Sequence, residues 1–161
     1  MAKATGTPAT TALTRAGVPF TLHPYEHDPA APSYGLEAAQ ALGIDPARLF
    51  KTLLVDTDCG PAVGIVPVDR QLDLKAIAAT VGSKRATMAQ PAAAERLTGY
   101  VVGGISPFGQ RRRLRTVLDA SALSHDTVLV SGGRRGLDVE LAPADLVRVL
   151  EATVAAISRT G

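Results

Sequence analysis

The chain is organised around residues 100–115, which read YVVGGISPFGQRRRLR. Its short apolar run leads into two glycines, which allow positive φ and a close approach of the backbone to a ligand. Pro107 fixes its own φ and biases Ser106 towards an extended conformation. The pattern predicts a stiff, bent loop with bare amides, one hydroxyl and a cationic exit, which suits an acyl or phosphate oxygen. An ordinary Gly/Pro turn between two strands is the alternative.

The composition favours one domain covering residues 1–161, with 46% hydrophobic residues and only 4% aromatic ones. No apolar run approaches the ~20 residues of a membrane span. The N-terminus also lacks the apolar segment of a secretory signal, so we expect a cytoplasmic protein without membrane contact. Cys59 is the single cysteine, and the three histidines lack metal-binding spacing. We therefore expect no metal and no cofactor.

The net charge is only +2, but the arginines gather in one part of the chain. Between residues 103 and 136, six arginines stand against two aspartates. This asymmetry indicates a localised surface that faces anions; a solvated strip of arginines is the alternative. The arginines that we expect to contact phosphates are Arg111, Arg112, Arg113, Arg134 and Arg135.

Periodicity and capping signals predict helices that alternate with short strands. Helices are expected at residues 8–16, 33–43, 72–81, 91–97 and 143–155. Strands are expected at residues 19–23, 49–55, 62–68, 114–119, 127–130 and 137–141. Because the order shows no strict βαβ rhythm, we expect a mixed α+β fold with a curled, barrel-like sheet rather than a doubly wound one.

Two further features add to the loop at residues 103–110. Lys51 shares one face of its expected strand with Leu53 and Val55, so it must reach solvent, pair with an anion or line a pocket. A lysine that protects an edge strand from aggregation is the alternative. The stretch SGGRRG at 131–136 is a second glycine-rich loop, with amides of Gly132 and Gly133 that suit an anion. It is not a P-loop, because a strand follows where a helix should.

Taken together, these segments resemble the YbaK/EbsC family of free-standing aminoacyl-tRNA deacylases, which are related to the editing domain of bacterial prolyl-tRNA synthetases. The most specific matches are FKTLL at residues 50–54 and VGGISP at residues 102–107. Further matches follow in chain order at residues 17–20, 25–28, 38–46 and 130–137. The resemblance implies a mixed α/β domain built on a curled sheet, with helices around it.

The resemblance also implies the site residues. Lys51 would contact the 3′-terminal nucleotide or the acyl ester, and the amides of Gly103 and Gly104 would hold the oxyanion. Ser106 and Pro107 belong to the same loop, where Ser106 is expected to shape the loop or line the site rather than to act as a nucleophile. The residues expected to line the substrate pocket are Tyr25, Tyr34, Thr52, Ser131, Gly132, Gly133 and Asp138.

The branch that the chain resembles most removes cysteine from mischarged tRNA(Pro), with the substrate's own thiol as the nucleophile. The resemblance thus implies mischarged tRNA(Pro) and prolyl-tRNA synthetase as partners, and no DNA. Two alternatives stay open: a deacylase for another mischarged tRNA such as Ala-tRNA(Pro), and a non-catalytic module of the same fold that binds tRNA or the synthetase.

Overall fold

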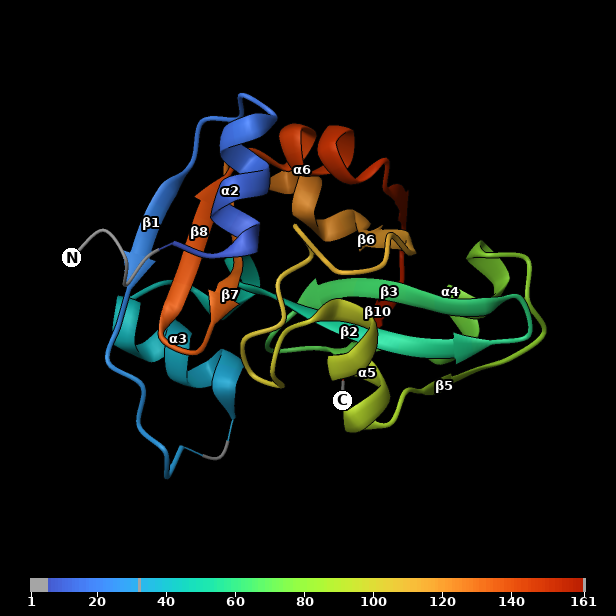
Figure 1. Cartoon of the computed structure of the whole chain (residues 1–161). Helices are drawn as coiled ribbons and strands as arrows, with labels where there is room; N and C mark the ends of the chain where they lie inside the picture. Colours follow the sequence, from blue (N-terminus) through green and yellow to red (C-terminus); the bar gives the residue numbers. More distant parts are fainter. Residues whose placement is uncertain (1–5, 32, 161) are drawn as a thin grey trace.

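The computed structural model describes residues 6–31 and 33–160, and it has the expected mixed α+β architecture (Figure 1). The helices are α2 (Pro8–Arg15), α3 (Tyr34–Leu42), α4 (Leu74–Thr80), α5 (Pro91–Thr98) and α6 (Pro143–Leu150). Two 3₁₀ turns cover Pro46–Arg48 and Ala120–Ser124. The strands are β1 (Thr21–Pro24), β2 (Phe50–Thr57), β3 (Gly60–Pro67), β4 (Gln71–Leu72), β5 (Ala86–Met88), β6 (Arg115–Asp119), β7 (Val128–Arg134), β8 (Leu137–Leu141), β9 (Thr153–Ala155) and β10 (Ser158–Arg159).

The described strands form three sheets. The largest has the order β5-β2-β3-β6-β9, in which β2 and β3 make an antiparallel hairpin while β6 pairs parallel with β3 and β9. A second, antiparallel sheet has the order β1-β8-β7, and β10 pairs with β4. A single parallel bridge between Leu49 and Leu129 joins the start of β2 to β7. The barrel-like closure that we expected is not confirmed, because none of these three sheets closes on itself.

The helices begin and end where local capping chemistry places them. Ser33 accepts a hydrogen bond from the Leu36 amide, and Gly43 ends α3 in the left-handed conformation with φ 66°. Gly99 ends α5 in the same way at φ 81°. These signals lie within one or two turns of the chain, so the sequence predicts them well. No helix in residues 6–31 or 33–160 is long and apolar enough to span a membrane.

The last predicted helix, at residues 143–155, is wrong in its second half. Helix α6 ends at Leu150, and Glu151 follows with a positive φ of 51°. Val154, expected on the apolar face of the helix, lies instead in β9, opposite Leu118 of β6. The spacing of apolar residues suits either element, and only the unpaired edge of β6 favours the strand.

Strand β2 lies between packed clusters but keeps part of one edge free. Phe50 and Leu54 pack into the main core with Phe108, whereas Val55 packs on the other side of the sheet with Ile77. Strand β5 pairs only with Val55–Thr57 of β2, and the Ala89 amide extends this pairing to the Leu54 carbonyl. Among the described strands, none pairs with the outer edge of β2 before that point. The candidate site lies along this open edge.

Candidate active site

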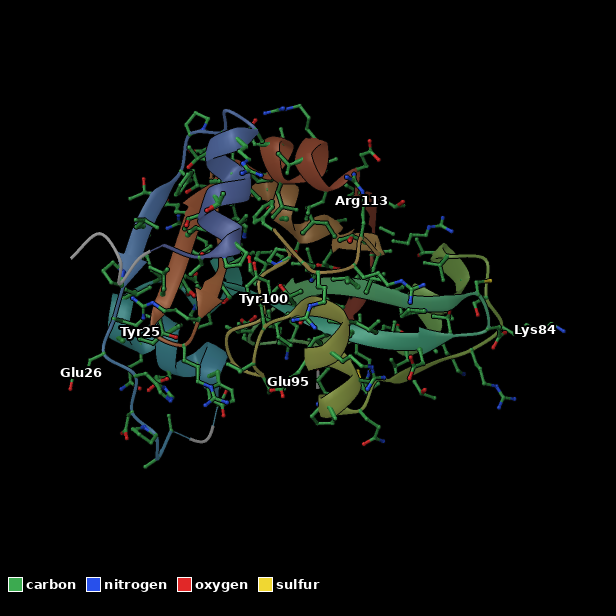
Figure 2. The ribbon with its side chains drawn as sticks, in the orientation of Figure 1. Tyr25, Glu26, Lys84, Glu95, Tyr100 and Arg113 are labelled. Atoms are coloured by element: carbon green, nitrogen blue, oxygen red, sulfur yellow. The ribbon has the colours of Figure 1, made fainter. Side chains whose placement is uncertain are left out.

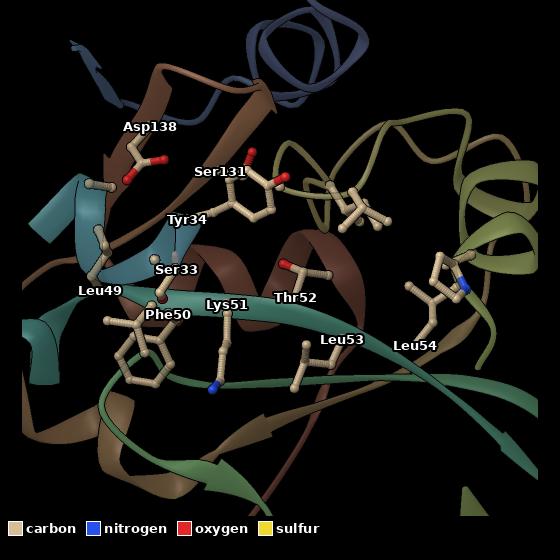
Figure 3. Close-up of a pocket in the computed structure, with 18 of the residues that line it drawn as sticks. Ser33, Tyr34, Leu49, Phe50, Lys51, Thr52, Leu53, Leu54, Ser131 and Asp138 are labelled. Carbon is tan, nitrogen blue, oxygen red and sulfur yellow. The ribbon is translucent and has the colours of Figure 1, made fainter. Parts of the chain in front are cut away.

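A cavity of about 400 Å³ follows the open edge of β2 (Figure 3). Its walls come from α3, from the loop after α5, from β7 and β8, and from the segment between β5 and α5. Apolar walls are supplied by Ala38, Phe50, Leu54, Met88, Ala94 and Ile105. The cavity brings together seven of the predicted site residues: Tyr25, Tyr34, Lys51, Thr52, Gly103, Ser131 and Asp138.

Lys51 and Thr52 reach opposite sides of β2. Figure 3 shows Thr52 on the side of Tyr34 and Ser131, while the amine of Lys51 points the other way. This follows from the strand itself, in which successive side chains alternate between faces. Burial lowers the pKa of Lys51, while the nearby Asp69 carboxylate acts in the opposite direction. An ester lying across the edge would therefore meet hydroxyls on one side and an ammonium group on the other.

Thr52 carries an unsatisfied polar group into the cavity. The residue is 8% exposed, and its buried Oγ1 has no hydrogen-bond partner among the described residues. Because the Leu54 carbonyl faces β5, alternation places the Thr52 amide and carbonyl on the same open edge. A buried hydroxyl without a partner costs about 1–3 kcal/mol, so this position favours a ligand that completes its hydrogen bonds.

Asp138 is the acidic group of the cavity. It is 6% exposed, and burial raises its pKa to about 7. It lies opposite Ser131 in the β7–β8 pairing, and Figure 3 shows both side chains on the same side of β2 as Thr52. Tyr25, whose amide donates to the Gly136 carbonyl at 2.9 Å, has its pKa raised to about 12 by burial and then by the Asp138 charge.

Tyr34 is held at the mouth of the cavity by three neighbours. Its ring centroid lies 4.9 Å from the Arg135 guanidinium carbon and 5.9 Å from the His27 ring. A Cβ added at Gly103 would lie 2.8 Å from the Tyr34 ring, and Gly103 has a φ of 89°. Both the contact and the conformation therefore require glycine at this position.

The two predicted oxyanion amides are not equivalent. The Gly104 amide donates to the Val101 carbonyl at 2.9 Å, so the expectation that both amides are free is wrong. Only Gly103 lines the cavity, and its amide has no acceptor among the described residues. The Gly104 amide is used in a tight turn that the sequence alone does not reveal.

Ser106 and Pro107, predicted to bind substrate, lie outside the lining of this cavity. Ser106 is fully buried, and its Oγ accepts a hydrogen bond from the Phe108 amide at 3.2 Å. The Tyr100 hydroxyl donates to the Phe108 carbonyl at 2.6 Å. Pro107 borders a separate cavity of about 250 Å³ beside α6. Ser106 thus shapes the loop from within, and the prediction that these two residues contact substrate is not supported.

The second glycine-rich loop also differs from its prediction. Gly132 and Gly133 are not among the residues that line the cavity. The Gly132 carbonyl accepts from the Thr7 hydroxyl at 2.5 Å, and the Gly133 amide donates to Ser131 Oγ at 3.2 Å. The predicted anion-binding amide of Gly133 is therefore already engaged. The loop contributes the side chain of Ser131 instead.

The arginines divide between two surfaces. Arg135 donates from Nε to the Val102 carbonyl at 2.8 Å and lies at the cavity mouth, and Arg134 donates to the Arg135 carbonyl at 3.1 Å. Arg113 pairs with Glu151 at 3.0 Å beside α6. Figure 2 shows Arg113 well away from Tyr25, which lines the cavity. The exposed Arg111 and Arg112 adjoin Arg113 in the chain.

Two carboxylates that sequence reasoning did not select hold the walls of the cavity. Glu95 accepts from the Val102 amide at 2.8 Å, which fixes the loop before Gly103. Glu37 lies 2.9 Å from the His27 ring nitrogen and also accepts from the Asp28 amide. Burial acts to raise the pKa of Glu37, but these hydrogen bonds lower it overall. Neither Glu37 nor Glu95 lies in a motif, and each contacts its partner only in the folded chain, so the sequence did not single them out.

The cavity offers hydroxyls, one carboxylate, the Lys51 amine and the backbone amides of Thr52 and Gly103, but no cysteine or histidine among its lining residues. Cys59 is exposed at the tip of the β2–β3 hairpin. Within residues 6–31 and 33–160, no group of three or more histidine, cysteine or acidic side chains is arranged to hold a metal ion. The arrangement can bind and polarise an acyl ester, and it contains neither a Ser–His nor a Cys–His pair.

Comparisons with known proteins identify relatives of this chain. Over 121 residues the chain is 37% identical to EbsC of Enterococcus faecalis, a candidate Cys-tRNA(Pro)/Cys-tRNA(Cys) deacylase; the match covers 74% of each chain. Over 99 residues it is 32% identical to ProXp-y of Escherichia coli, a multifunctional Ser/Thr-tRNA deacylase, covering 61% of this chain and 59% of the relative.

Among solved structures, a candidate trans-editing enzyme for prolyl-tRNA synthetase superposes with a TM-score of 0.81 at 26% identity, covering 94% of this chain and 95% of that one. The sequence model of the aminoacyl-tRNA editing domain matches residues 28–149, which include every residue named above as lining the cavity except Tyr25. On these grounds the chain belongs to the aminoacyl-tRNA editing domain family.

Proposed function

We propose that the protein deacylates Cys-tRNA(Pro), in the cytoplasm and in company with prolyl-tRNA synthetase. The observation that carries the proposal is the cavity on the β2 edge, which gathers Thr52, Ser131, Asp138 and the Gly103 amide without a cysteine or histidine to activate a nucleophile. A site of this kind suits a substrate that brings its own nucleophile, as a cysteinyl ester does.

The chemistry needs little from the protein. The cysteine thiol attacks the ester carbonyl carbon, the bond to the ribose oxygen breaks, and the thiol proton goes to that leaving oxygen. The product is a thiolactone, which water opens. The Gly103 amide would donate to the carbonyl oxygen as negative charge develops there, and one such donor is worth roughly 100–1000-fold in rate.

Lys51 fits the nucleotide side of the substrate. Because its amine leaves β2 on the face opposite Thr52, it would contact the 3′-terminal phosphate or ribose while the aminoacyl group occupies the other side. Tyr25 and Tyr34 would close the acyl side, with Arg135 beside the Tyr34 ring at the mouth.

A deacylation panel tests the proposal. Purified protein is incubated with Cys-tRNA(Pro), Ala-tRNA(Pro), Ser-tRNA and Pro-tRNA(Pro), and we expect the cysteinyl ester to be cleaved fastest. Cleavage of all esters at one rate would contradict the thiol mechanism. Preference for the alanyl or seryl ester would favour the alternative in which another mischarged tRNA is the substrate and the Tyr34 hydroxyl alters selectivity.

Lys51→Ala separates an enzyme from a binding module. We expect turnover to fall while tRNA affinity changes little, because one phosphate contact is a small part of tRNA binding. Lys84→Ala is the matched control, since Lys84 lies at the far tip of the molecule (Figure 2). A loss of affinity in Lys51→Ala, with no turnover in the unmutated protein, would support the module instead.

A further inference from the structure

Two carboxylates on the same face of β8 have opposite surroundings. Glu140 accepts from His23 at 2.7 Å, from Arg48 at 3.0 Å and from the Thr127 hydroxyl. Asp138, two residues earlier, lines the cavity, and no described residue donates a hydrogen bond or a positive charge to it. Strand alternation places both side chains on one face, so the difference comes from their partners and not from orientation.

Among the described residues, no neighbouring element pairs a cation with Asp138; Arg134 of β7 donates to the Arg135 carbonyl instead. On β1, His23 lies opposite Asp138 in register, but its ring is engaged by Glu140. Tyr25 follows β1 and is neutral, since its pKa is raised to about 12. Ser131 on β7 is uncharged, and Lys51 on β2 points to the other side of the strand. A buried carboxylate without a partner is costly, so the position favours a ligand that brings positive charge.

The substrate class proposed above carries such a charge. Every aminoacyl ester has an ammonium group on the carbon next to the reacting carbonyl. We infer that Asp138 receives this α-ammonium group, so that the site accepts tRNA esters with a free α-amino group and discriminates against N-acylated ones. The unpartnered Thr52 hydroxyl faces the same cavity and can accept a second ammonium hydrogen.

The inference rests on the proposed function for its substrate but has its own test. N-acetyl-Cys-tRNA(Pro) keeps the thiol, so thiolactone formation stays chemically possible and only the charge is lost. We expect its kcat/KM to be about 10–100-fold below that of Cys-tRNA(Pro), the worth of one charge-assisted hydrogen bond. Asp138→Asn should reduce turnover of Cys-tRNA(Pro) by a similar factor and leave the acetylated substrate unchanged.

Glu140→Gln is the matched control, because it neutralises the neighbouring carboxylate outside the cavity. It should keep the unmutated ratio between the two substrates. Equal turnover of free and acetylated substrates by the unmutated protein, or an equal loss of both in Asp138→Asn, would overturn the inference.

A binding measurement separates failure of the inference from failure of the proposed function. The probes are 3′-deoxy-3′-(cysteinylamino)adenosine and its N-acetyl derivative, which are amides and resist cleavage. We expect the free amine to bind about 10-fold or more tightly than the acetylated form, and Asp138→Asn to remove the difference. If no ester is cleaved but this preference holds, the inference stands and the deacylase proposal fails. If both probes bind alike while Cys-tRNA(Pro) is cleaved, the inference is wrong and the function stands.

Discussion

The two glycine-rich loops look alike in the sequence, since each follows an apolar run and precedes arginines. In the structure they contribute different groups to the cavity. The loop at 103–110 is irregular and keeps its only hydroxyl, that of Ser106, inside the protein, so it offers the cavity a backbone amide. The loop at 131–136 is a β-hairpin that uses up its Gly133 amide and offers the cavity the Ser131 side chain.

The loops also depend on each other. A Cβ added at Gly104 would lie 2.8 Å from the backbone of Arg134, and Arg135 donates to the Val102 carbonyl at 2.8 Å. This close approach explains why position 104 needs glycine, and the Arg135 hydrogen bond joins the second loop to the first. The similarity in the sequence therefore reflects two halves of one wall, not two copies of an anion site.

The largest effect is expected from Gly103→Ala. The new Cβ meets the Tyr34 ring at 2.8 Å and disfavours the φ of 89°, which moves the amide and the ring together. We expect kcat/KM for the cysteinyl ester to fall at least about 100-fold, the worth of a misplaced oxyanion donor. Gly60→Ala is the control, because its φ of 105° is equally strained but nothing lies within 4 Å. Similar activity in both variants would contradict a role for Gly103 at the site.

Asp138 should make stability fall as the pH rises. Its pKa is raised to about 7 in the folded protein, whereas an unfolded aspartate titrates near about 4, so between these values the folded state binds more protons. Urea unfolding at about pH 5 and about pH 8 should show a loss on the order of a few kcal/mol that Asp138→Asn lacks. An identical pH dependence in both proteins would show that Asp138 is not desolvated.

Glu140, on the same strand, should have the opposite effect on the pH dependence of stability. The Thr127 hydroxyl, and then His23 and Arg48, outweigh burial and lower its pKa. Its contribution to stability is present above the ordinary glutamate pKa and is lost as the pH falls below it. Glu140→Gln should therefore destabilise the protein at neutral pH by about 1 kcal/mol and have little effect in acid, as measured by the same urea titrations.

Substitution of Ser106 and Ser131 should also distinguish the two loops, with smaller effects on activity than Gly103→Ala. Ser106→Ala removes an internal hydrogen bond and should cost about 1 kcal/mol of stability while the folded protein keeps its kcat. Ser131→Ala should instead lower kcat/KM about 10-fold, because this hydroxyl faces the cavity. Loss of kcat in Ser106→Ala, with thiol-free esters still cleaved by the unmutated protein, would point to a serine nucleophile.

The smallest effect concerns the arginines and is measured by the salt dependence of tRNA binding. Arg135→Ala should reduce the slope of log K against log salt by about 1, since this residue lies at the cavity mouth. Arg113→Ala should change the slope less, because Glu151 already pairs with Arg113 beside α6. Equal reductions would show that tRNA covers both surfaces, and unchanged slopes would remove the arginines from the interface.

Short segments of sequence were enough to predict several helix ends and the family. Gly43 and Gly99 end their helices as expected, because a cap depends on residues within one turn. The FKTLL and VGGISP segments led to the right family through their combination. The predictions failed where backbone pairing decided the outcome: β6 pairs with residues 153–155 of the expected helix, and a local turn pairs the Gly104 amide with the Val101 carbonyl.

The amino-acid sequence shows which chemical groups are present and how they are spaced: a lysine beside a threonine on one strand, a pair of glycines before a proline, and a serine seven residues before an aspartate. The tertiary structure added that the outer edge of β2 at these two residues is left open by the other described strands, and that Asp138 is buried with no hydrogen-bond partner among the described residues. Open edges and desolvated charges depend on what packs nearby, and that packing joins residues far apart in the chain.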